Sequence, residues 1–225
     1  MFTLTSRFGY TSALLAFLAA AGYCIVQLLQ VFGWLPYPFD EFLIYGFSLF
    51  IAIPYMLAIM ALHREIKDDK KTWTHAALLT ATLYAVYATL VYVVQLAMVV
   101  PQSLRGDTEG IGVVVMYQHS LFWTLDALTY IMLGLSTFFA AFAFEKNGED
   151  KWLRNFLLAN AAITPLIAFV YFYPNFSTGL LFLGSPWIIT APGSMLLLAQ
   201  YFRRLRIENK PVIRFRSAEL IEILE

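Results

Sequence analysis

The sequence predicts an all-α integral membrane protein, a six-transmembrane-helix bundle with both termini cytoplasmic. Composition is the first of three observations behind this prediction. Of 225 residues, 60% are hydrophobic and 13% are charged, and the mean hydropathy is +0.68. Soluble domains carry about 25% charged residues, so this chain has too little polar surface for a water-soluble globule. The formal net charge is zero, so the overall charge gives no indication of a nucleic-acid partner.

Continuous apolar runs are the second observation. A helix needs about 20 mainly apolar residues to cross the hydrocarbon core. Transmembrane strands instead alternate polar and apolar residues, which these runs do not. Six runs meet or approach the required length: 10–32, 42–62, 76–100, 122–144, 156–173 and 181–202. They form one transmembrane domain, 1–204, followed by a short tail, 205–225, in which Ser217 is a candidate helix cap.

Each run has features that support this assignment. The first follows Arg7 like a signal peptide, but its apolar character continues through Val31, too far for a signal core, so we predict a true span. The second and fifth each contain a proline near the middle, and the fifth is the shortest. The third and fourth carry polar residues, discussed below. The sixth is interrupted by two prolines.

The distribution of cationic residues is the third observation. Lysine and arginine beside short loops stay on the cytoplasmic side. With six spans, all 15 Lys and Arg residues except Arg105 fall on one side, together with both termini. This asymmetry predicts that both termini lie in the cytoplasm. The chain has the general character of small prokaryotic membrane proteins, so we expect it in the inner membrane of a prokaryotic cell.

Asp126 is the only acidic residue within the six runs, and the runs contain no Lys or Arg. The missing lysine excludes a retinal Schiff base. A carboxylate in hydrocarbon needs neutralisation, a polar partner or a wet cavity. His119, Trp123, Asp126 and Tyr130 are spaced to form one stripe on a helix. We predict that this stripe faces an outward-opening cavity together with polar residues of other spans, namely Gln27, Gln30, Tyr92, Gln95 and Thr190. The alternative is an interhelical hydrogen bond, for example from Asp126 to Gln95 or a tyrosine.

Four prolines are candidate hinges: Pro54, Pro165, Pro186 and Pro192. Proline removes a helical hydrogen bond and tends to kink or break the helix. Small residues four apart, Ala16 with Ala20 and Ser136 with Ala140, allow close helix contact. We predict no metal site and no cofactor.

Three functions are compatible with these features. The first is binding, with or without transport, of a lipid or other hydrophobic small molecule in the cavity. The second is a structural or regulatory membrane subunit that contacts copies of itself or another membrane protein. The third is a lipid-modifying enzyme, with His119 and Asp126 as an acid–base pair, but two helical turns place these residues about 10 Å apart.

Overall fold

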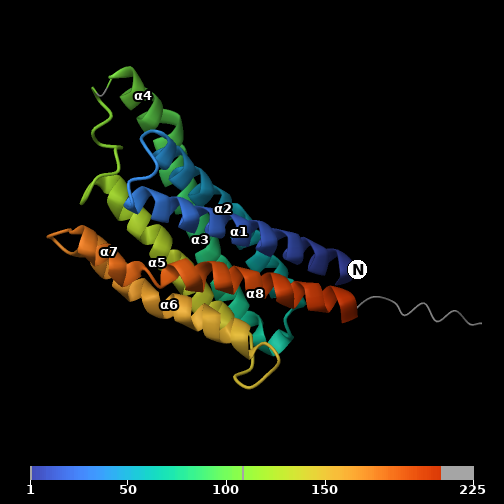
Figure 1. Cartoon of the computed structure of the whole chain (residues 1–225). Helices are drawn as coiled ribbons and strands as arrows, with labels where there is room; N and C mark the ends of the chain where they lie inside the picture. The colour runs from blue at the N-terminus through green and yellow to red at the C-terminus, as the bar shows by residue number, and fades with distance from the viewer. Residues whose placement is uncertain (1, 108, 209–225) are drawn as a thin grey trace, which may run out of the picture.

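The computed structural model describes residues 2–107 and 109–208, and this part of the chain is helical without any strand (Figure 1). Most of the tail, with the helix predicted after Ser217, lies outside the described residues. The helices are α1 (Phe2–Val31), α2 (Phe39–Glu65), α3 (Lys71–Val94), α4 (Val100–Arg105), α5 (Leu121–Ala141), α6 (Lys151–Phe172), α7 (Thr178–Gly184) and α8 (Trp187–Glu208). A 3₁₀ turn, η1 (Asp68–Lys70), precedes α3, and a π-helical segment, η2 (Gln95–Val99), joins α3 to α4.

Six helical segments of the described chain are long and apolar enough to cross a membrane. The third segment combines η1, α3, η2 and α4, and the sixth combines α7 and α8. This confirms the predicted all-helical fold with six helical segments suited to span a membrane. Most helices extend beyond the predicted runs, because their polar ends continue the helix past the apolar part: α2 reaches Glu65 and α6 begins at Lys151. The α5 helix instead ends at Ala141, short of the predicted end at 144.

The six spans form a closed ring in which α1 packs against α2 and α8, and α5 packs against α3 and α6; α2 meets α3, and α6 meets α8. The first turn of α1 and the last turns of α8 lie at the same end of the bundle (Figure 1). We call this the amino end. There Ser6 donates to the Glu65 carboxylate, and Arg204 pairs with Asp150. The opposite, far end carries segments 32–38, 106–107, 109–120 and 173–177.

Small residues line the helix contacts. Ala13, Ala16 and Ala20 on α1 are at most 1% exposed, as are Ser136 and Ala140 on α5. Such residues let helix backbones approach closely where the surrounding lipid gives no hydrophobic drive for association. The small-residue pairs of the sequence therefore lie at helix contacts within one chain.

The break between α7 and α8 falls at Ser185 and Pro186. Pro186 has no N–H to continue the helical ladder, and the chain changes direction here. The α8 helix runs along α1, whereas α7 packs on α6 and diverges from α1 (Figure 1). The other candidate hinges, Pro54, Pro165 and Pro192, lie inside continuous helices.

Candidate ligand-binding cavity

A cavity of about 420 Å³ lies where α7 diverges from α1, in the half of the bundle nearest the far end. Its size is within the range of small-molecule sites, about 300–1,000 Å³. Its lining is mainly apolar, with aromatic and aliphatic side chains in similar number and a few polar groups. The aromatic members are Tyr23, Tyr45, Tyr92, Trp123, Tyr130, Tyr171, Phe176, Phe182 and Trp187; the polar members are Gln27, Gln30, Glu41, Ser48, Asp126 and Ser185.

Asp126 lies in the wall of this cavity and joins three helices. Its Oδ1 accepts a 2.7 Å hydrogen bond from Tyr92 on α3, and its Oδ2 accepts one from Tyr171 on α6. Thr129, one turn on along α5, donates to the Asp126 carbonyl at 2.6 Å. Asp126 is only 5% exposed. The carboxylate thus makes the interhelical tyrosine contact that the sequence offered as an alternative, and it also lines a cavity.

A second set of hydrogen bonds leads from the cavity floor toward the far end. The Tyr130 and Tyr23 hydroxyl oxygens are 3.0 Å apart, and Tyr23 donates to Gln27 Oε1 at 2.9 Å. Gln27 then donates to Gln30 at 3.1 Å, and Gln30 donates to Asp40 Oδ2 at 3.0 Å. This series of hydrogen bonds runs along the last three turns of α1. Each of these tyrosine and glutamine side chains therefore has a donor engaged within the protein.

The aromatic rings of the wall are in contact with one another. Ring centroids are 4.5 Å apart for Trp123 and Tyr171, 5.8 Å for Tyr171 and Tyr130, and 5.6 Å for Tyr130 and Trp187. Tyr23 continues the row, 5.4 Å from Trp187. Edge-to-face and tilted pairs at such distances are favourable. They form a continuous aromatic wall from α6 through α5 and α8 to α1.

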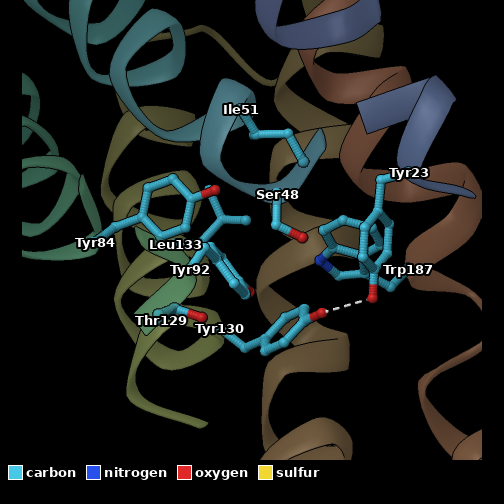
Figure 2. Close-up of a pocket in the computed structure, with 9 residues that line it drawn as sticks. All are labelled: Tyr23, Ser48, Ile51, Tyr84, Tyr92, Thr129, Tyr130, Leu133 and Trp187. Carbon is cyan, nitrogen blue, oxygen red and sulfur yellow. Dashed lines mark hydrogen bonds between the residues drawn. The ribbon is translucent and has the colours of Figure 1, made fainter. Parts of the chain in front are cut away.

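A much smaller cavity, of about 10 Å³, lies beneath the large one and shares Tyr23, Ser48, Tyr92, Tyr130 and Trp187 with it. Figure 2 shows Tyr23 and Trp187 on one side of this space and Tyr84 on the other, with the Tyr23–Tyr130 hydrogen bond marked. Its volume suits about one water molecule. The hydroxyl groups around it make the floor of the large cavity polar.

The structure brings together six of the nine predicted ligand-binding residues. Trp123, Asp126 and Tyr130 on α5 face the cavity as a stripe, as their helical spacing predicts. Three residues of other helices join them, namely Tyr92, Gln27 and Gln30. His119, Gln95 and Thr190 are not among the lining residues.

His119 leaves the stripe because it precedes the helix. Its φ of 64° is left-handed, and α5 begins only at Leu121, capped by the Ser120 hydroxyl. The exposed His119 ring contacts the Pro174 carbonyl at 3.2 Å instead.

Thr190 on α8 donates to Asn160 on α6, and Asn160 donates to Thr137 on α5. Thr190 thus belongs to a partly buried contact among three helices.

Gln95 holds the far-end loop in place. It lies in η2 and is 1% exposed. Its side chain donates to the Val114 carbonyl at 2.7 Å and accepts from the Met116 N–H at 3.4 Å. Met116 lines the cavity, so Gln95 positions one part of its wall indirectly.

Substituting Gln95→Ala is expected to release this loop. Two hydrogen bonds are lost, each worth about 1 kcal/mol, so amide exchange across 111–117 should accelerate by about thirtyfold, because the local opening that permits exchange becomes easier. Hydrogen–deuterium exchange with mass spectrometry measures it. Gln102→Ala in α4 is the matched control, and equal exchange in both variants would contradict the positioning role.

Sequence reasoning missed several wall residues, namely Tyr23, Glu41, Tyr45, Tyr171 and Trp187. Tyr171 and Trp187 resemble membrane-interface residues in the sequence, because aromatic belts occur near span ends. Their depth in the spans is a signal that could have placed them in the cavity wall. Counted from the far ends of the spans, both residues lie at about the depth of Asp126.

The chain matches no protein-family model, no curated protein and no solved structure in comparisons with each. The geometry of the cavity is therefore the basis for the function proposed below.

Proposed function

We propose that this protein binds a lipid or other hydrophobic small molecule in the cavity between α1, α5, α6 and α7. The supporting observation is a cavity of about 420 Å³ with an aromatic wall and a few placed polar groups around Asp126. Small-molecule sites are typically concave, mostly apolar and equipped with a few polar groups that orient the ligand.

The rim of the cavity supports entry from the membrane. Leu28 and Val31 on α1 and Leu181 and Phe182 on α7 line the cavity and are exposed on the bundle surface. These side chains lie on helical segments long and apolar enough to cross a membrane, α7 as part of the segment it forms with α8, so the opening between them faces lipid tails. A hydrophobic molecule could pass between α1 and α7 without crossing water.

In this proposal the cavity opens toward the outer side of a prokaryotic cytoplasmic membrane. The described cationic residues other than Arg105 lie on α1, α2, α3, α6 and α8 or their loops near the amino end. The positive-inside rule places that end in the cytoplasm. For transport, Pro186 is the best-placed of the candidate hinges, because it lies between α8 and the diverging α7.

Native mass spectrometry of the mildly purified protein tests the binding function, with extraction and identification of any bound molecule. We expect one stoichiometric hydrophobic ligand. Ile44→Trp should abolish it, because Ile44 lines the cavity and the larger side chain fills the space. Ile53→Trp on the same helix is the matched control, since Ile53 is 45% exposed and is not a lining residue.

A ligand that is retained in the folded Ile44→Trp variant would place binding elsewhere. Bare protein, or a fixed oligomer without ligand, would overturn the proposal in favour of a structural or regulatory subunit acting through helix contacts.

A further inference from the structure

The hydrogen-bond donors and acceptors of the cavity wall indicate which chemical groups a ligand can present to it. The hydroxyl donors of Tyr92 and Tyr171 are directed at Asp126, and that of Tyr23 at Gln27. The Trp123 indole N–H is directed at the Tyr171 carbonyl at 3.0 Å. These donors are engaged within the protein. A carboxylate, by contrast, has about four lone-pair positions, so Asp126 keeps acceptor capacity after its two tyrosine bonds and a longer 3.4 Å contact from the Thr129 hydroxyl.

Charge in the wall has one sign. Asp126 and Glu41 both line the cavity, and among the described residues no lysine or arginine does. Glu41 lies in the first turn of α2, and Tyr45 is one turn further along the same wall. A ligand with a phosphate, sulfate or carboxylate would meet two carboxylates and no cationic partner, which disfavours anionic molecules.

The aromatic faces of the wall favour the same charge. The π face of tyrosine or tryptophan is negative and attracts a cation held within about 6 Å of the ring centroid. Trp123, Tyr171, Tyr130 and Trp187 supply successive rings beside Asp126, with neighbouring centroids 4.5 to 5.8 Å apart. Cages of this kind recognise organic ammonium groups. The volume of about 420 Å³ is far larger than a bare metal ion needs.

We infer that the cavity selects organic ammonium cations with an apolar body, held by the Asp126 and Glu41 carboxylates and the faces of the aromatic wall. The inference rests on the proposed binding function and narrows it from hydrophobic molecules in general to lipophilic amines. The apolar body lies toward the exposed rim of α1 and α7, and the cationic nitrogen lies at the Asp126 end.

Four compounds that share one apolar body test the charge preference in the intact chain reconstituted in nanodiscs. Protonated 1-aminoadamantane and its quaternary N,N,N-trimethyl form are cations, 1-adamantanol is neutral, and 1-adamantanecarboxylate is an anion. Titration calorimetry should show that at least one cation binds at a single site about tenfold more tightly than the alcohol. We expect no saturable binding of the carboxylate. The two cations distinguish two interactions. Only the protonated amine can donate a hydrogen bond to Asp126, whereas both cations are attracted to the ring faces.

Variants connect this preference to the wall. Asp126→Asn and Glu41→Gln should each weaken cation binding about tenfold more than they weaken adamantanol binding. Glu109→Gln removes the same charge from an exposed far-end loop and should change neither. The inference is overturned if neither cation binds, if alcohol or carboxylate binds as tightly as the cations, or if both charge variants retain full affinity. Each of those results leaves the proposed function standing as long as Ile44→Trp still removes a native hydrophobic ligand.

Discussion

Replacing Gly134 with alanine should destabilise the bundle by about 3 kcal/mol, the upper part of the range for overpacked sites. A Cβ at Gly134 on α5 would lie 1.8 Å from the Thr164 Oγ1 and 2.6 Å from the Thr164 Cβ on α6. The Thr164 Cβ is fixed by its own helix, so a rotamer change does not relieve the overlap. The two helices must separate, and the separation disturbs the α5 and α6 side of the cavity.

Reversible unfolding from detergent micelles, or a thermal melt in the same detergent, measures this loss. Gly46→Ala in α2 is the control, because no atom lies within 4 Å of the added Cβ; it should stabilise by up to about 1 kcal/mol through helix propensity. The double variant with Thr164→Ala should recover part of the loss, since it removes Oγ1 and Cγ2. Equal stability of Gly134→Ala and wild type would mean that α5 and α6 are further apart than the structure shows.

Replacing Asp126 with alanine should cost about 2 kcal/mol in stability even without ligand. Two tyrosine hydroxyls lose their acceptor, and Tyr92 is only 6% exposed. Such bonds to a charged acceptor are worth about 1.5–3 kcal/mol in soluble proteins. Interhelical hydrogen bonds in membranes average about 0.6 kcal/mol, because the unfolded helices find other partners in the bilayer. The value expected here lies between these limits, at about 1 kcal/mol for each bond.

Double-mutant cycles separate the two bonds. Asp126→Ala is combined in turn with Tyr92→Phe and Tyr171→Phe, and each coupling free energy should lie near 1 kcal/mol. Tyr45→Phe is the matched control, because Tyr45 lines the same cavity and stacks on Tyr92 at 6.1 Å, with no hydrogen bond to Asp126. Coupling no larger than that of the control would show that Asp126 does not hold α3 and α6 together.

The predictable part of the site lies on one helix. Trp123, Asp126 and Tyr130 could be placed on a common face because they belong to α5 and helical geometry fixes their spacing. His119 follows the same spacing but lies outside the helix, because the chain takes a left-handed turn there before α5 starts. Nothing in the residue types at 117–120 marks that turn as strongly as a glycine would.

Contributions from other helices were harder to predict. Tyr171 and Tyr23 reach the cavity because α6 and α1 are rotated to present them. Both helices are largely apolar, and the polar residues that share these faces, such as Gln27 on α1 and Thr164 on α6, are too few to fix that rotation from the sequence. Thr190 illustrates the same difficulty: its polarity suggested the cavity, but the rotation of α8 directs it to Asn160.

The sequence by itself determined the membrane environment, the number of spans and their helical character. Those properties follow from the length and apolarity of each run, and both are local. The tertiary structure alone decided which side chains meet, that the chain diverges at Pro186 and not at Pro192, and that the divergence leaves a cavity between α1 and α7. The physical reason is that helix rotation and register within a bilayer depend on close packing between neighbours, such as Gly134 against Thr164, rather than on a hydrophobic face written into each helix.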